Sequence, residues 1–224
     1  FRRVLFRSYH EAGHALVGLK VKGNDPLHKV TIVPRGQALG VTMNLPEKDA
    51  LNYTESQMKA RMAMMYGGRV AEEIIFGEAS TGASNDLMQA TNMARRMVTE
   101  FGMSKNLGRV RYAGNQQDGF LGAFAGASKD HSEKTAELID EEIRNKADDA
   151  EKIARDTLQQ YSKELHLIAN TLLERETLSG EEVDKLLRGE PLGPVLPRFV
   201  TPPPSEPMSP PPVAGASPSP AAPM

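Results

Sequence analysis

Two histidines and a glutamate near the start of the chain have the types and spacing of a metal-dependent hydrolase. They stand in His10-Glu11-Ala12-Gly13-His14, the pattern H-E-x-x-H, and the chain has only five histidines in 224 residues. On a helix, positions i and i+4 share a face, so both imidazoles can bind one cation. Glu11 need not bind the metal. Its carboxylate can take a proton from a water that the metal activates and pass it to a departing amine.

A catalytic zinc needs a third protein ligand and an open position. Because the chain has no cysteine, disulfides, thiolate zinc sites and cysteine nucleophiles are excluded, and the ligand must be a carboxylate or another histidine. Two carboxylates are the main candidates, Glu72 and Asp86. Each also has an ordinary interpretation, Glu72 as part of a solvated helix face with Glu73 and Asp86 as an acid complementing a helix N-terminus. Spacing alone leaves the choice open, and the remaining candidates are His28, His131 and His166.

Apolar periodicity predicts the elements that hold these residues. A helix over residues 9–22 ends at the turn sequence Gly23-Asn24-Asp25-Pro26, and two short strands near 30–33 and 39–43 form a hairpin. Helices are predicted from the capping box Thr54 to Gln57 up to Gly77, from an N-cap at Ser84 to Gly102, and from Ser132 to about Tyr161. Two shorter helices follow, the last capped at Ser179. The expected fold is mainly α with a small β-hairpin.

Small residues mark places where these elements come close. Gly67-Gly68 interrupt a helix at a cost in propensity, which favours close packing or a break over a catalytic feature. Gly13 lets the first helix pack closely behind the metal. Residues 103–130 are glycine-rich and irregular, with possible short extended pieces at Val110, Tyr112, Phe120 and Leu121.

Composition limits the class of protein. A hydrophobic content of 39% supports a core, and a net charge of -2 offers no basic excess for nucleic acid. No apolar run reaches the roughly 20 residues of a membrane span, so we expect a soluble chain. Residues 1–8 are predicted to be a leader, with an artefactual origin as one interpretation, and residues 9–190 to be a folded domain. Residues 191–224, with thirteen prolines, are predicted to be a disordered tail.

Four ordered motifs give the chain a resemblance to a known family. They are Tyr9 to Ala15, Lys29 to Gly36, Gly67 to Glu73 and Ser80 to Leu87. Together they strongly resemble the peptidase domain of FtsH, the bacterial membrane-anchored AAA-type ATP-dependent zinc metalloprotease. The resemblance covers about residues 9–190 and includes Ala94 to Val98 and Glu176 to Ser179.

The resemblance implies that His10, His14 and Asp86 bind one Zn²⁺ and that Glu11 is the catalytic base. It further implies a helical zinc metalloendopeptidase that forms a hexamer and degrades unfolded or membrane proteins. The chain contains no G-x-x-x-x-G-K-[ST] phosphate loop, so ATP use and membrane contact are expected of a longer parent in the bacterial inner membrane, with this domain on its cytoplasmic face.

Two other functions compete with this prediction. One is a stand-alone zinc peptidase with Glu72 as its third ligand. The other is a non-catalytic helical oligomerisation module, in which the apolar seams of the long helices after Ser132 pack between subunits.

Overall fold

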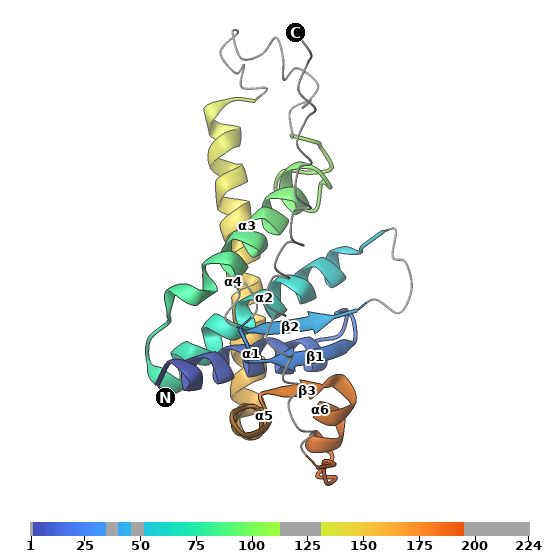
Figure 1. The fold of residues 1–224 in the computed structure, drawn as a ribbon. Coiled ribbons are helices and arrows are strands. Elements are labelled where there is room, and N and C mark those ends of the chain that lie inside the picture. Colours follow the sequence, from blue (N-terminus) through green and yellow to red (C-terminus); the bar gives the residue numbers. More distant parts are fainter. Residues whose placement is uncertain (1, 35–39, 46–51, 113–130, 195–224) are drawn as a thin grey trace, which may run out of the picture. The chain divides into compact units, whose positions relative to one another are not determined.

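A computed structural model describes residues 2–34, 40–45, 52–112 and 131–194. The chain divides into two units, Phe1–Gly193 and Pro194–Met224, and the elements below belong to the first. In chain order they are α1 (Arg2–Lys20), β1 (Leu27–Thr31), β2 (Val41–Asn44), α2 (Glu55–Phe76), the 3-10 turn η1 (Thr81–Ala83), α3 (Ser84–Thr99), α4 (Glu133–Gln160), α5 (Ser162–Arg175), β3 (Thr177–Ser179) and α6 (Gly180–Leu187) (Figure 1). The predicted mainly helical fold is confirmed.

The strands form one antiparallel sheet in the order β2-β1-β3. Val30 of β1 lies opposite Thr42 of β2 and Leu178 of β3, and both Val30 and Leu178 are buried. A hairpin of β1 and β2 is present as predicted, but β1 is Leu27–Thr31, so residues 32–33 follow the strand instead of belonging to it, and Leu39 lies outside the described residues. The sequence analysis missed β3, because three residues are too few to show an alternating pattern.

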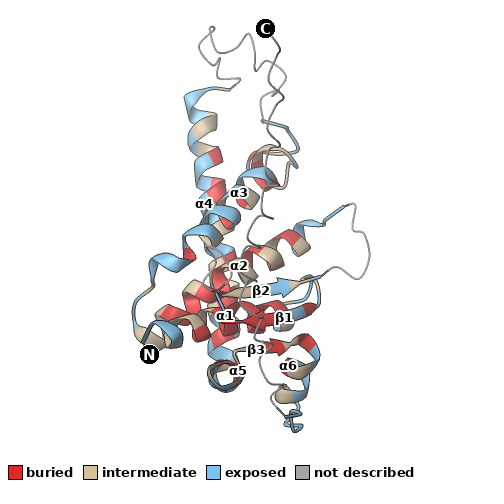
Figure 2. Ribbon diagram, in the orientation of Figure 1, coloured by how far each residue is buried: buried red, intermediate tan, exposed pale blue. Residues whose placement is uncertain are grey.

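Helix α1 is the central element of this unit. It contacts α2, α4 and α5 as well as β1 and β2, and its second half is buried, as Figure 2 shows. At the crossing with α2, a Cβ on Gly13 would lie 2.3 Å from the carbonyl oxygen of Gly67, and a Cβ on Gly67 would lie 2.7 Å from that of Gly13. The helices therefore meet backbone to backbone, which confirms the close packing predicted for these glycines.

Most helix ends follow the predicted capping residues. Thr54 and Gln57 form a capping box at α2, Gly77 ends that helix at a φ of 73°, and Ser132 caps α4. The N-cap predicted at Ser84 is wrong. Ser84 is the first residue of α3, because η1 intervenes and is itself capped by Ser80.

The N-terminal and C-terminal segments, residues 1–8 and 191–224, are predicted to be separate from the folded domain. Helix α1 begins at Arg2, so residues 2–8 continue the helix; Arg7 donates a hydrogen bond to the carbonyl of Ile32 (2.9 Å), and Ser8 to that of Ala169 (2.5 Å). Most of the proline-rich tail and residues 113–130, including Phe120 and Leu121, lie outside the described residues. The proposed division at residue 9 stays a prediction.

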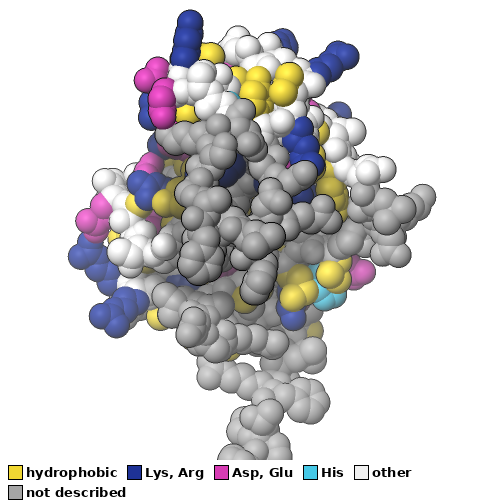
Figure 3. Space-filling view, turned by 90° about the horizontal axis from the view of Figure 1, so that it is seen from above, with side chains coloured by type: hydrophobic (Ala, Val, Ile, Leu, Met, Phe, Trp, Pro, Cys, Tyr) yellow, Lys and Arg dark blue, Asp and Glu magenta, His cyan; other side chains and the backbone are white. Residues whose placement is uncertain are grey.

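Surface charge and helix hydropathy are the features on which the predictions about nucleic acid and membrane depend. On the face shown in Figure 3, Lys and Arg side chains of the described residues are interspersed with acidic and apolar ones. Among the helices of the described ranges, none is both long and apolar enough to cross a membrane.

A polar cluster ties the segment after α3 to the long helix α4. The buried carboxylate of Glu142 accepts hydrogen bonds from Ser104 (2.6 Å) and Asn106 (2.7 Å), and Lys146, one turn on, pairs with Glu55 of α2 (2.7 Å). The hydrogen bond from Ser104 outweighs the effect of burial and lowers the pKa of Glu142. The ionised form is thus favoured in the fold.

We expect Glu142→Gln to lower the free energy of unfolding by about 2 kcal/mol at pH 7. Because the folded pKa of Glu142 is lowered, its contribution is complete above the unfolded value of about 4.3 and is lost as the pH falls through the folded value. The difference between wild type and variant should therefore shrink from about pH 5 downward. Urea unfolding at several pH values measures it, with Glu137→Gln on the exposed side of α4 as control; a difference independent of pH would contradict the account.

Candidate metal centre

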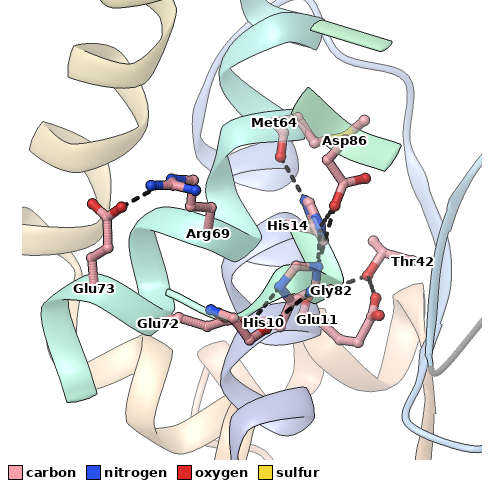
Figure 4. A network of polar contacts seen from close by, with 11 residues as sticks. His10, Glu11, His14, Thr42, Met64, Arg69, Glu72, Glu73, Gly82 and Asp86 are labelled. Carbon is pink, nitrogen blue, oxygen red and sulfur yellow. Dashed lines mark hydrogen bonds and ion pairs between the residues drawn. The ribbon is translucent and has the colours of Figure 1, made fainter. Parts of the chain in front are cut away.

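Three side chains converge where the first turn of α3 approaches the middle of α1. His10 and His14 lie one helical turn apart, and their Nε2 atoms are 3.1 Å from each other. Asp86 brings its Oδ2 to 3.3 Å from the Nε2 of His10 and 3.4 Å from that of His14 (Figure 4). Within the described ranges, these residues are the one group of three His or acidic side chains whose ligand atoms all lie close enough to share an ion.

The separations fit a metal ion. A tetrahedral zinc with bonds of about 2.0 to 2.1 Å keeps its ligand atoms about 3.3 to 3.4 Å apart, close to the three distances found here. The donor set of two imidazoles and one carboxylate is also one that zinc accepts. The residues therefore fit the metal that the H-E-x-x-H pattern predicts.

Hydrogen bonds on the far side of each ring set the imidazole orientation. His14 Nδ1 lies 2.7 Å from the carbonyl oxygen of Met64, and His10 Nδ1 lies 2.8 Å from Oε1 of Glu72. A carbonyl and an ionised carboxylate can only accept, so both Nδ1 atoms carry the hydrogen. When a ring is neutral, as metal binding requires, its lone pair is then on Nε2, facing the centre of the group.

Glu72 is a partner of His10 rather than a member of the central group. Its side chain is 2% exposed, and besides His10 it accepts hydrogen bonds from the backbone N–H and the hydroxyl of Ser80. The interpretation of Glu72 as a solvated residue is therefore wrong, whereas Glu73 pairs with Arg69 and Arg155. Glu72 contacts the Nδ1 side of the ring, and Asp86 faces the Nε2 side.

The charges around the group favour a cation. Burial by itself would lower the pKa of His10, but hydrogen bonds to Asp86 and Glu72, with the charge of Glu11 nearby, raise it to about 9. Burial also opposes ionisation of Asp86, yet hydrogen bonds from His10 and His14 hold its pKa far below the usual range. Burial by itself would raise the pKa of Glu72, but hydrogen bonds from His10 and Ser80 lower it. The two carboxylates thus remain ionised and attract positive charge.

Glu11, the predicted base, lies beside the histidines on α1 and is 5% exposed. Its Oε2 accepts a hydrogen bond of 2.7 Å from the hydroxyl of Thr42 in β2. Sequence reasoning missed Thr42, because nothing in the spacing relates it to a residue 31 positions earlier.

The other histidines do not join the group. His28 is exposed on β1, and His166 on α5 lies 2.7 Å from the hydroxyl of Tyr9. His131 forms an edge contact with the ring of Tyr112.

Gly68 of α2 leaves the space into which the ligand nitrogens project. A Cβ at this position would lie 2.5 Å from Nε2 of His14 and 2.7 Å from Nε2 of His10. We therefore expect Gly68→Ala to weaken metal binding by about 10- to 100-fold, as other disturbances next to metal ligands do. Titration with a competing chelator measures this.

The matched control is Gly193→Ala, after α6. A Cβ at Gly193 would meet no other atom within 4 Å, so metal affinity should stay at the wild-type level. Equal affinities for Gly68→Ala and Gly193→Ala would contradict the assignment of this space to the metal.

Comparison with known proteins shows the family of the chain. The family model of peptidase family M41 matches residues 4–186. Proteins called ATP-dependent zinc metalloprotease FtsH are 50% identical over 197 residues in Sorangium cellulosum (FtsH 4), 49% over 186 in Caulobacter vibrioides and 46% over 184 in Magnetococcus marinus. The matches cover 87%, 82% and 82% of this chain, but only 30%, 30% and 27% of those proteins. The resemblance noted in the sequence is confirmed, and the chain belongs to peptidase family M41.

Proposed function

We propose that this chain is the zinc metalloendopeptidase domain of a longer ATP-dependent protease and that it hydrolyses peptide bonds in unfolded or membrane-protein substrates. One observation carries the proposal: two imidazole Nε2 atoms and one carboxylate oxygen converge at 3.1 to 3.4 Å. They do so beside the carboxylate of Glu11, and the curated relatives bear the name zinc metalloprotease.

In this proposal, His10, His14 and Asp86 hold one zinc ion per chain, and Glu72 orients His10. When bound, zinc supplies a Lewis acid that lowers the pKa of a water ligand and polarises the scissile carbonyl. Met64 fixes the ring of His14 through its backbone carbonyl. These contacts keep both Nε2 lone pairs directed at one point without rearrangement.

Glu11 acts as the base. Its carboxylate takes the proton from the attacking water and gives it to the amine nitrogen as the peptide bond breaks. Burial of Glu11 at 5% exposure keeps bulk water from competing for this proton, so transfer to the leaving amine is favoured.

Strand β2 is the proposed place of substrate binding. It lies at the edge of the sheet and pairs with β1 on one side. An extended peptide can add along its other side through backbone hydrogen bonds, which confer little sequence selectivity. This suits an enzyme that degrades many unfolded chains, and Thr42 of the same strand contacts the proposed base.

Properties of the longer protein are proposed from the relatives. Their name describes an ATP-dependent enzyme, and we place ATP use in a part of the protein that this sequence does not span. By the same resemblance we propose a homo-hexamer held in the bacterial inner membrane, with this domain on the cytoplasmic side.

Cleavage of a reduced and alkylated, permanently unfolded protein by the purified chain, without ATP, tests the proposal. We expect cleavage that a chelator abolishes and added zinc restores. A folded chain that binds zinc and forms hexamers but cleaves nothing would contradict it and favour a non-catalytic oligomerisation module.

A further inference from the structure

Thr42 of β2 and Gly40, just before this strand, lie next to the carboxylate of Glu11, and the mechanism above assigns them no role. The hydroxyl of Thr42 lies 2.7 Å from Oε2 of Glu11, and a Cβ on Gly40 would lie 2.5 Å from Oε1. Residues 40–42 therefore lie against both carboxylate oxygens, and Figure 4 shows the hydrogen bond from Thr42. Glu11 and Thr42 stand 31 residues apart, so only the fold brings them together.

We infer that Thr42 is a positioning residue for the base, with its hydroxyl fixing Oε2 of Glu11 while the missing side chain of Gly40 leaves room for Oε1. The inference rests on the proposed function, which makes Glu11 the base. It adds a residue from a second element to the machinery that the H-E-x-x-H helix provides.

The hydrogen bond is directed at the carboxylate. Thr42 Oγ1 is also 3.2 Å from the backbone oxygen of Glu11, but it has one proton, and a bond to an ionised acceptor is shorter and stronger than one to a carbonyl. Among the described residues, Thr42 is the donor that lies within hydrogen-bond distance of this side chain. Without it, a glutamate with three rotatable bonds would have to keep its orientation by packing alone.

The same strand is the one on which we place the substrate. A peptide that pairs with β2 is held by the backbone on either side of Thr42, and Thr42 holds the base. Strand β2 thereby positions both the peptide and the carboxylate of Glu11, so the distance from the base to the scissile bond depends on this one strand. An error of about 1 Å in such a distance can cost about 100-fold in rate.

Thr31 of β1 offers a matched control. It too is a strand threonine with a hydroxyl in tertiary contacts, 3.1 Å from the carbonyl oxygen of Glu176 and 2.7 Å from Oγ1 of Thr177. Those contacts join β1 to the segment of β3 and do not involve the site. Thr31→Val therefore removes a strand hydroxyl, as Thr42→Val does, but it leaves the contact between Thr42 and Glu11 intact.

The experiment measures kcat, KM and zinc content of the full chain on the unfolded protein substrate. We expect Thr42→Val to lower kcat by about 10- to 100-fold, with KM changed less than about twofold and zinc content unchanged, because no ligand is touched. Thr42→Ser keeps the hydroxyl and should return kcat to near the wild-type value. Thr31→Val should lower the melting temperature and leave kcat at the wild-type level.

Gly40→Ala gives a second route to the same conclusion, since a methyl would displace Oε1 of Glu11. It should lower kcat with zinc retained, and it decides the matter if Thr42→Val does not fold. A zinc-loaded wild type without cleavage would overturn the proposed function itself. If the wild type is active, the positioning role alone would be overturned by a wild-type kcat in Thr42→Val, or in Gly40→Ala if Thr42→Val does not fold. A kcat of Thr42→Ser as low as that of Thr42→Val would overturn it too.

Discussion

Glu11→Gln should lower kcat for cleavage of an unfolded protein by about 10²- to 10⁴-fold while leaving the metal bound. The amide has nearly the shape of the carboxylate and can remain near Thr42, but it cannot accept a proton at neutral pH. Glu11 is not one of the three residues whose ligand atoms converge, so zinc content should be unchanged. Elemental analysis and cleavage assays on the same preparation separate the two effects.

The matched control for this variant is Glu137→Gln, the same change on the exposed side of α4. It should retain the wild-type kcat. If Glu11→Gln cleaved at the wild-type rate, another group would have to be the base. If Glu11→Gln lost its zinc, Glu11 would instead belong to the metal site.

Asp86→Ala should abolish cleavage, and added zinc should not restore it. Two histidines on one helix remain, and they lack the carboxylate that closes the group and neutralises the ion. Zinc should also stop raising the melting temperature, because a ligand stabilises a fold only if it binds the folded state. For the wild type, free zinc at 1,000 times the Kd would raise the free energy of unfolding by about 4 kcal/mol. Thermal unfolding with and without zinc measures this.

The comparison variant is Glu72→Gln. Its amide can still contact Ser80, and it leaves all three ligand atoms in place, so zinc should still raise the melting temperature, with an affinity lowered by about 10- to 100-fold. An Asp86→Ala protein that zinc stabilises as strongly as wild type would remove Asp86 from the proposed ligands.

The two histidines, the base and the helix that holds them could be predicted from residues alone, because H-E-x-x-H is a local pattern. The third ligand could not. Glu72 and Asp86 are both carboxylates on predicted helices, and which of them reaches Nε2 of His10 depends on how α2 and α3 pack against α1. Only the resemblance favoured Asp86, and in the structure it is Asp86 that faces the Nε2 atoms.

The place of Glu72 on α2 explains its burial. Gly68 faces the ligand nitrogens, and Glu72 follows it by four residues, so both share a face of α2. The neighbouring Glu73 points elsewhere, toward Arg69 and Arg155. The identical side chains of Glu72 and Glu73 hid this difference from an argument based on composition.

Short and long-range features were beyond the sequence for different reasons. Strand β3 has three residues, too few for a period to show. The N-cap was misplaced at Ser84 because η1 inserts a tight turn whose cap, Ser80, also binds Glu72. The contact of Thr42 with Glu11 depends on the path from α1 to β2, which no local pattern encodes.

Binding of one zinc ion by His10, His14 and Asp86 can be tested through the metal content per chain, measured by elemental analysis of purified wild type, Asp86→Ala and Glu72→Ala. We predict one zinc per wild-type chain, its loss in Asp86→Ala and its retention in Glu72→Ala. Loss of zinc from Glu72→Ala but not from Asp86→Ala, or no zinc in a folded wild-type chain supplied with the metal, would contradict the account.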